Sequence, residues 1–223
     1  MLINDLNYFK KSANYCNTTS GIDHPDLCSC TSKDWYAYPI QDFDYKFNSW
    51  GFRGTEYEQF VGKSVNICLG DSFTVNVGGP IEHSWCSQLA EHFDIPTLNL
   101  GMDGAGNDAI RLVYDRACKI FNVQNTFVMY SFLHRRLHMG EFIQVPDEFL
   151  DNKDYFLQHR ITNAHEAALP SYWSKVERAF LKHAKIFTQD TTERNRDGFH
   201  MNKEANKIYA DYFYKQWKQR NES

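Results

Sequence analysis

Two short motifs hold residue types that could act together as a nucleophile and its base. Gly70-Asp71-Ser72-Phe73-Thr74 directly follows an apolar run, and Asp197-Gly198-Phe199-His200 precedes the last predicted helix. A serine hydroxyl is a poor nucleophile until a neighbouring base takes its proton. Because Asp197 can accept a hydrogen bond from one imidazole nitrogen of His200, the other nitrogen can take the proton of Ser72. The two motifs therefore predict nucleophilic catalysis.

The predicted secondary structure brings both motifs to one edge of a sheet. Three short apolar runs predict buried strands, at 65–69, 97–100 and 126–130. Helical stripes separate these strands; Ser84 can cap the first helix, and Asn107 or Asp108 the second. This alternation predicts a parallel sheet with helices on both faces. Sites in such sheets form beyond the carboxyl ends of the strands, here in the loops 70–83, 101–107, 131–140 and 189–201.

The remaining segments are less regular. Residues 1–60 predict an irregular N-terminal arm packed on a main domain at 61–223. Strand-like pieces occur in the arm at 35–40 and 45–47. Apolar residues at helical spacing predict two late helices, one at Trp173, Val176, Phe180 and Ala184, and one at Ala205, Ile208, Tyr209, Tyr212, Phe213 and Trp217. A short strand is predicted between them, at 186–188.

Composition and charge narrow the classes of partner. The chain has 223 residues, 42% of them hydrophobic, and can bury a core without metal or disulfide support. Its 24 basic and 28 acidic residues give a net charge of −4, whereas duplex-binding domains usually carry a basic excess. No run resembles a membrane span, and the first residues lack the pattern of a secretory signal peptide. We expect no nucleic-acid partner, no membrane span, and a cytoplasmic or viral, lysis-released protein.

Two groups of side chains have the residue types of a metal site without its usual spacing. The first is Cys16, His24, Cys28 and Cys30, with Cys-x-Cys where zinc modules use Cys-x2-Cys. The second is His134 and His138, which could share a helix face but lack the Glu of a His-Glu-x-x-His motif. The glycines of loop 101–107 do not have dinucleotide-binding spacing either. We therefore expect no metal and no organic cofactor, and reduced thiols.

Taken together, the motifs resemble those of the SGNH (GDSL-type) hydrolase family over residues 63–215. The first motif is similar to the family's nucleophile block, and the second to its terminal acid–base block. Asn99-Leu100-Gly101-Met102-Asp103-Gly104 resembles the second block, whose glycine, here Gly104, donates a backbone amide to the oxyanion hole. The resemblance implies a three-layer α/β/α fold with a small parallel sheet, flavodoxin-like, beside the N-terminal arm. It also implies that Ser72, His200 and Asp197 form a catalytic triad. From its residue type and its place after a strand, Asp71 is expected to organise its own turn.

The third block departs from the family pattern. Members usually carry Gly-x-Asn-Asp after the third strand, and that Asn completes the oxyanion hole, whereas this chain reads Tyr130-Ser131-Phe132-Leu133-His134. Asn107 is a candidate substitute, alongside the backbone amides of Ser72 and Gly104. Three residues in or beside this stretch are further candidates for contacting substrate: Ser131, His134 and Arg135. Losing one oxyanion donor lowers turnover roughly a hundred- to a thousandfold, so catalysis would survive it.

The resemblance implies a serine esterase for small acyl esters, and we expect an O-acetyl group on a carbohydrate as the substrate. Two alternatives stay open: an inactive carbohydrate-binding or assembly module of the same fold, and an O-acyltransferase that uses the same triad. The Gly-x-Ser-x-Gly elbow of α/β-hydrolases is absent, because Thr74 stands where that motif needs its second glycine. The oligomeric state does not follow from the sequence.

Overall fold

A four-stranded parallel sheet forms the centre of the described structure. The computed structural model describes residues 21–23, 43–132, 134–138, 141–145, 177–180, 195 and 200–222. The sheet consists of β3 (Ser64–Gly70), β4 (Thr97–Gly101), β5 (Asn122–Tyr130) and β8 (Glu177–Phe180), in the order β4-β3-β5-β8. All neighbouring strands are parallel. The first of these strands lies between the second and the third, which is the flavodoxin-like order.

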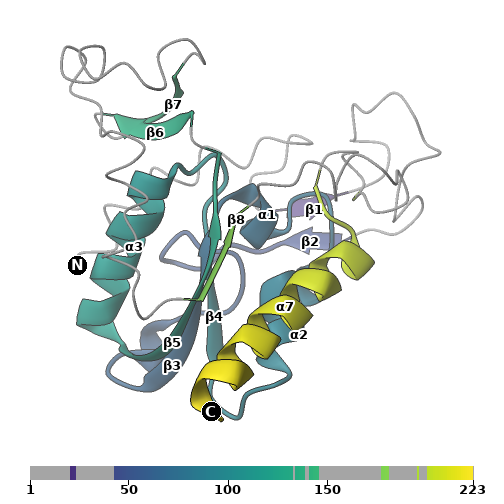
Figure 1. The fold of residues 1–223 in the computed structure, drawn as a ribbon. Helices are drawn as coiled ribbons and strands as arrows, with labels where there is room; N and C mark the ends of the chain where they lie inside the picture. Colours follow the sequence, from purple (N-terminus) through teal and green to yellow (C-terminus); the bar gives the residue numbers. More distant parts are fainter. Residues whose placement is uncertain are drawn as a thin grey trace.

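Helices cover both faces of this sheet, so the α/β/α layering predicted from the sequence is confirmed (Figure 1). α3 (Asn107–Ile120) lies on one face. α2 (Trp85–Ala90) and α7 (Lys203–Asn221) contact each other on the opposite face. Because β3 and β4 are parallel neighbours, their carboxyl ends lie at one edge of the sheet. α1 (Ser72–Val75) follows the end of β3, and α3 follows the end of β4.

Alternate side chains of the strands supply two separate hydrophobic clusters. Val65, Ile67 and Leu69 of β3 belong to the cluster on the α3 side, whereas Cys68 belongs to the cluster on the α2–α7 side. β5 alternates in the same way. Because both faces of these strands are buried, each strand appears in the sequence as a continuous apolar run. This is why the strands predicted from the three apolar runs are confirmed.

Of the two predicted helix starts, one is confirmed and the other is wrong. The Ser84 hydroxyl caps α2 by accepting a hydrogen bond from the Ser87 backbone amide at 3.0 Å. Neither Asn107 nor Asp108 caps α3, because Gly106 is the residue that precedes its first turn. The buried side chain of Asn107 instead contacts the chain just beyond β5. A prediction from residue type alone cannot detect such a distant partner.

The helix predicted around residues 173–184 is wrong where the structure describes this segment. Glu177–Phe180 forms β8, which pairs with β5 from Phe127 to Tyr130. A few apolar residues at helical spacing are a weak signal, and pairing with an open strand edge outweighs them. The strand predicted at 186–188 lies outside the described residues.

The last helix is confirmed, but its buried face is narrower than predicted. Ala205, Tyr209 and Phe213 are buried, whereas Ile208 is 49% and Tyr212 42% exposed. The buried residues follow i, i+4 spacing, and the two exposed ones lie one position to the side of that row. In the part of the chain that the structure describes, no helix has the length and apolar character needed to span a membrane.

Two small antiparallel pairs stand beside the main sheet. β1 (Gly21–Asp23) pairs with β2 (Phe43–Tyr45), so the strand piece predicted at 45–47 only touches the end of β2. The piece predicted at 35–40 and the cysteines and histidine of residues 16–30 lie outside the described residues. Tyr57, in the segment that precedes β3, is buried in the hydrophobic cluster on the α3 side of the sheet.

The second pair is a hairpin of β6 (Arg135–His138) and β7 (Glu141–Gln144), which lies near the start of α3 (Figure 1). His134 and His138 therefore do not share a helix face, because the residues between them are in a strand. The sequence suggested i, i+4 spacing on a helix, but the hairpin pairing determines the local structure here.

Candidate functional site

Ser72 stands directly beyond the end of β3, where α1 folds back over the sheet edge. Two glycines permit this close packing. A side chain at Gly70 would place its Cβ 2.9 Å from a carbonyl oxygen of β5. A side chain at Gly101, at the end of β4, would place its Cβ 2.7 Å from a backbone nitrogen of α1. These two positions are paired across the strands, so glycine at both ends allows the Ser72 turn to lie on the sheet.

The position of Ser72 is also the one at which open parallel sheets commonly bind ligands. β3 and β5 are neighbours, yet the chain leaves β3 toward β4 on its other side. Connections that diverge in this way leave a crevice at the carboxyl ends of the two strands. Ser72 follows β3 and Ser131 follows β5. A reaction that uses residues of these two loops would therefore take place in the crevice at the carboxyl ends of β3 and β5, the switch point of the sheet.

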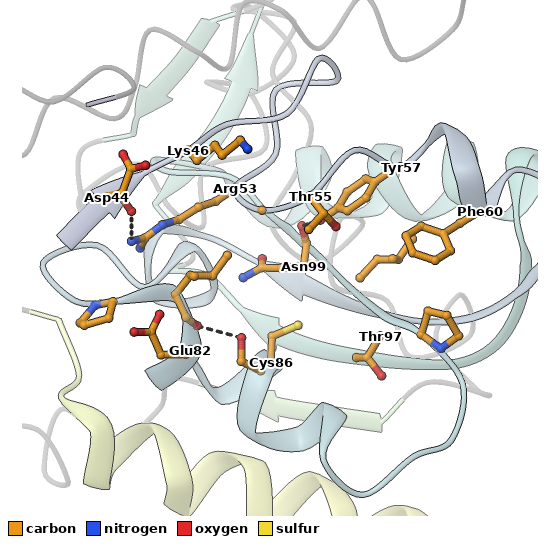
Figure 2. Close-up of a pocket in the computed structure, with 16 residues that line it drawn as sticks. Asp44, Lys46, Arg53, Thr55, Tyr57, Phe60, Glu82, Cys86, Thr97 and Asn99 are labelled. Carbon is orange, nitrogen blue, oxygen red and sulfur yellow. Dashed lines mark hydrogen bonds between the residues drawn. The ribbon is translucent and has the colours of Figure 1, made fainter. Parts of the chain in front are cut away.

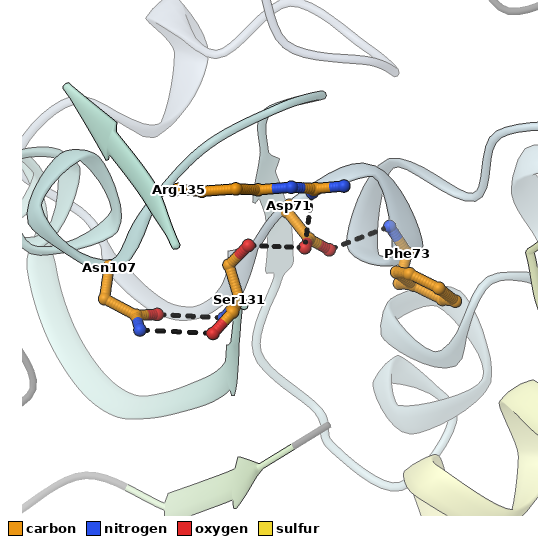
Figure 3. Close-up of polar contacts among 5 residues, drawn as sticks. All are labelled: Asp71, Phe73, Asn107, Ser131 and Arg135. Atoms are coloured by element: carbon orange, nitrogen blue, oxygen red, sulfur yellow. Dashed lines mark hydrogen bonds and ion pairs between the residues drawn. The ribbon is translucent and has the colours of Figure 1, made fainter. Parts of the chain in front are cut away.

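The Asp71 carboxylate, next to Ser72, is buried and joins several loops (Figure 3). It accepts hydrogen bonds from the Ser131 hydroxyl at 2.7 Å, from the Phe73 backbone amide at 3.1 Å, and from the Arg135 guanidinium at 3.0 Å. Burial raises the pKa of Asp71, and the Arg135 charge and the two hydrogen bonds oppose that rise. The prediction that Asp71 organises its own turn is confirmed, and its partners extend to the ends of β5 and β6.

Two of the three side chains considered for substrate contact bind this carboxylate, and the third stacks on a neighbouring ring. The Ser131 hydroxyl and the Arg135 guanidinium are both bound to Asp71, and Arg135 is only 9% exposed. Arg135 also lies over the Phe132 ring, with its guanidinium carbon 4.9 Å from the ring centroid. The His134 ring stacks on the same phenyl ring, at 5.5 Å between centroids. Ser131 and Arg135 therefore support the Asp71 turn in this structure.

His200 lies against the residue that follows Ser72. Its imidazole is buried, and its centroid is 4.6 Å from the centroid of the Phe73 ring. The Asn195 backbone amide donates to the His200 carbonyl oxygen at 2.6 Å. The Asn195 side chain donates to the Val77 carbonyl oxygen at 2.9 Å, which ties this segment to the loop after α1. The fold thus brings the segment before α7 to the same edge of the sheet as Ser72, while Asp197 lies outside the described residues.

The two remaining oxyanion candidates are Gly104, on the β4–α3 connection, and Asn107, the first residue of α3. Gly104 has a φ of 75°, a left-handed conformation that favours glycine. The Asn107 side-chain oxygen accepts from the Ser131 backbone amide at 2.8 Å, and its nitrogen donates to the Ser131 carbonyl at 3.2 Å. Asn107 thus joins the start of α3 to the residue that follows β5 (Figure 3). This pairing uses one of its two amide hydrogens and leaves one for another acceptor.

Asp103 is an acidic residue at this edge that the sequence analysis did not single out. Its side chain is 6% exposed, and its Oδ2 atom has no hydrogen-bond partner in the described structure. Burial raises the pKa of Asp103 to about 7; the Asp71 charge adds to the rise, whereas His200 and Arg135 oppose it. Its position beside Gly104, after a strand end, was the only sequence signal that could have drawn attention to it.

A separate cavity of about 760 Å³ lies along the outer edge of β4 (Figure 2). None of the candidate residues described above lines it. The Tyr57 hydroxyl at this cavity donates to the Asn99 carbonyl at 2.8 Å, and the Arg53 guanidinium donates to the Asp44 carbonyl at 3.0 Å. The Tyr57 bond joins the segment before β3 to β4, and the Arg53 bond joins two parts of that segment to each other. The grouping of serine, histidine and acidic side chains is found instead at the carboxyl ends of β3 and β4.

The strand order, the two helical layers and the loops at the switch point define a flavodoxin-like α/β/α protein with a serine at the end of its first sheet strand. No family model matches the chain, and no curated protein matches it. Its relations to known proteins are therefore relations to solved structures.

Three solved structures illustrate the likeness. One is the psychrotrophic esterase EstA from Pseudoalteromonas, inhibited by monoethylphosphonate: identity is 14%, 72% of this chain and 99% of that chain are covered, and the TM-score is 0.45. A G-D-S-L family lipolytic protein from Desulfitobacterium hafniense is 17% identical, with 71% and 73% covered and a TM-score of 0.29. A member of the same family from Veillonella parvula is 14% identical, with 71% and 100% covered and a TM-score of 0.40. The fold assignment rests on the strand order and layers of this chain, not on these values.

Proposed function

We propose that this chain is a serine ester hydrolase of the SGNH type, with Ser72 as nucleophile and His200 as general base. One observation carries the proposal: the His200 imidazole lies against Phe73, the neighbour of Ser72, at the carboxyl end of the first sheet strand. This contact supports the proposal that a nucleophile and a base from distant parts of the chain act together at the crevice of the sheet. Asp197 is proposed to orient the imidazole.

The proposed reaction has two halves. Ser72 Oγ attacks the ester carbonyl carbon, its proton passes to His200, and the carbonyl oxygen becomes an oxyanion near the backbone amides of Ser72 and Gly104. Collapse of this intermediate breaks the bond to the alcohol, which leaves with the proton from His200. Water then attacks the acyl-serine, His200 accepts a water proton, and the acid is released as Ser72 regains its proton.

The burial of the site supports a small acyl group. Ser72 and His200 are each 1% exposed, and a small acyl group can approach so enclosed a serine more readily than a long acyl chain can. We propose acetyl esters, and O-acetyl groups on a carbohydrate in particular. Because His200 must be neutral to accept a proton, activity should rise with pH through the imidazole pKa, which is ordinarily about 6.5.

Covalent labelling tests the nucleophile directly. A fluorophosphonate probe should modify Ser72, as read by mass spectrometry of the digested protein. Ser72→Ala should remove the label and lower p-nitrophenyl acetate turnover at least about 10⁴-fold. Ser64→Ala is a matched control because Ser64 starts the same strand at its opposite end, and it should leave both readouts unchanged. Labelling of a different serine, with Ser72 unmodified, would refute the proposal.

An inactive carbohydrate-binding or assembly module is the second candidate. The burial of the Ser72 hydroxyl and the lack of Asn in the third block favour it. Equal ester turnover by the wild type and Ser72→Ala would support this reading. An O-acyltransferase would use the same residues, and it would reveal itself by transferring the acetyl group to an added acceptor sugar.

A further inference from the structure

Asp103 differs from Asp71, the other buried aspartate described at the site, in having a carboxyl oxygen that the fold does not bind. Its carboxyl is buried, yet Oδ2 has no hydrogen-bond partner in the part of the chain that the structure describes. A buried polar atom without a partner is costly and calls for a reason, and a ligand that supplies the missing partner is one such reason. The position of Asp103 shows which ligand atom could do so.

The loop that carries Asp103 is fixed to the loop that carries Ser72. The Met102 backbone amide donates to the Gly70 carbonyl oxygen at 3.0 Å, so the chain just before Asp103 is joined to the end of β3. Gly104, the proposed oxyanion donor, follows immediately, and its backbone amide interacts with the Asp103 carboxylate. Asp103 therefore lies on a loop that is bonded to the end of β3 and that also carries a proposed oxyanion donor.

The charges around Asp103 come from three other elements. Among the described residues these are Asp71 before α1, Arg135 on β6 and His200 before α7. Asp71 and Arg135 already neutralise each other at 3.0 Å. Burial, the largest influence, raises the pKa of Asp103 to about 7, so a neutral carboxyl is present near neutral pH.

We propose that neutral Asp103 donates a hydrogen bond to the oxyanion formed when Ser72 attacks an ester, in place of the asparagine missing from the third block. This inference rests on the proposed function. The hydroxyl of a protonated carboxyl is a strong donor, and enzymes do hold acids neutral in buried sites for this purpose. The proton stays on Asp103 throughout, while the proton from Ser72 moves to His200.

An ionised Asp103 would have the opposite effect. A carboxylate beside the forming oxyanion would raise the energy of the intermediate, and it would have no proton to donate. The reaction thus needs a neutral His200 and a neutral Asp103 at once. The rate of the wild type should therefore follow a bell-shaped pH profile, rising as His200 loses its proton and falling as Asp103 does.

Two substitutions separate this role from the alternatives. Asp103→Asn keeps a donor that does not ionise, so its rate should stay within about tenfold of the wild-type optimum and should not fall at alkaline pH. Asp103→Ala removes the donor and should lower kcat about 100- to 1000-fold. Asp108→Asn is the matched control: Asp108 is a nearby carboxyl that accepts from the Leu137 and Ala109 amides, and an Asn oxygen can still accept from one of them. Its pH profile should match the wild type.

The measurement is kcat for p-nitrophenyl acetate from pH 5 to 9, corrected with Ser72→Ala. An alkaline limb in Asp103→Asn like that of the wild type would overturn the inference. Full activity of Asp103→Ala would also overturn it. A rate lost at every pH in Asp103→Asn would show that the charged form is needed, as a partner of His200, and would equally overturn it. Fluorophosphonate labelling of Ser72 in the wild type keeps these failures distinct, because only its absence counts against the proposed function.

Discussion

The loops after β3 and β4 each carry a buried aspartate, and the structure treats the two in opposite ways. Asp71 accepts from a hydroxyl, a guanidinium and a backbone amide. Asp103 leaves Oδ2 without a partner. Both carboxyls have raised pKa values because both are buried. Burial alone therefore does not distinguish a structural acid from a reactive one; the distinction comes from how many donors the fold supplies.

This difference follows from where the donors originate. The partners of Asp71 lie on α1, directly after β5, and on β6, so its carboxylate connects α1 with the end of β5 and with β6. Asp103 lies on a connection whose own neighbour, Gly104, offers only a backbone amide. We infer that the loop after β3 is rigid, and that the loop after β4 keeps the Asp103 carboxyl available for a bound substrate.

The largest expected effect is on stability when Asp71 is removed. Asp71→Ala leaves the Arg135 guanidinium buried without its carboxylate and should lower the free energy of unfolding by about 3–5 kcal/mol. The raised pKa of Asp71 shows that burying its charge costs free energy. Removing the carboxylate is nevertheless destabilising, because its buried partners are then left without it. Urea denaturation monitored by tryptophan fluorescence would measure the change.

Asp103→Ala is the comparison in the same experiment. It removes a carboxyl whose burial costs free energy, so at pH 7 the free energy of unfolding should stay unchanged or rise, and should not fall as it does in Asp71→Ala. If Asp71→Ala and Asp103→Ala lowered the free energy of unfolding by similar amounts, the contrast between a carboxyl that stabilises the fold and one that is available for substrate would be wrong. If Asp71→Ala were as stable as the wild type, the ion pair would not hold the loops together.

The sequence predicted much of this arrangement for identifiable reasons. β3, β4 and β5 are buried on both faces, so they appear as apolar runs closed by glycine or by polar loops. The Ser84 cap depends on residues close in sequence and is confirmed. The parallel order followed from the alternation of strands and helices. These features are local, or follow from general topology.

The features that the sequence did not predict depend on distant partners. β8 exists because β5 offers an open edge, and its residues at helical spacing misled the prediction. Asn107 pairs with Ser131 across 24 positions and does not cap its own helix. The state of Asp103 depends on burial by elements that no spacing rule brings together. Such contacts become visible only in three dimensions.

The second expected effect concerns pH. The pKa of Asp103 is raised to about 7 in the folded chain, whereas an unfolded Asp has a pKa near 3.9. Between these values the folded state binds a proton that the unfolded state has lost. Stability contributed by neutral Asp103 is therefore fully present below about pH 4 and is lost as pH rises to about 7.

Asp103→Asn isolates this contribution, because the amide does not titrate and the other groups cancel in the comparison. The free energy of unfolding of the wild type, relative to the variant, should fall by about 2–4 kcal/mol between pH 4 and pH 7.5. Urea denaturation at four or five pH values would show the slope. Parallel curves for the two proteins would mean that Asp103 is already ionised in the fold, and the contrast with Asp71 would lose its basis.

The smallest expected effect concerns the link between the Asp103 loop and the Asp71 turn. Asn107 joins the start of α3 to Ser131, whose hydroxyl in turn binds Asp71. Asn107→Ala would leave the Ser131 backbone amide and carbonyl without these buried partners. We expect a loss of about 2 kcal/mol in the free energy of unfolding.

Asn122→Ala is the matched control for this last change. Asn122 also donates from its side-chain amide, to the Ser64 hydroxyl at 3.0 Å, but at the exposed amino end of β5, where water can replace the bond. Its loss should stay below about 0.5 kcal/mol. A double variant of Asn107→Ala with Asp71→Ala should lose less than the two single losses combined, because both substitutions release Ser131. Strict additivity would show that the two loops are held independently, and that Ser131 does not couple them.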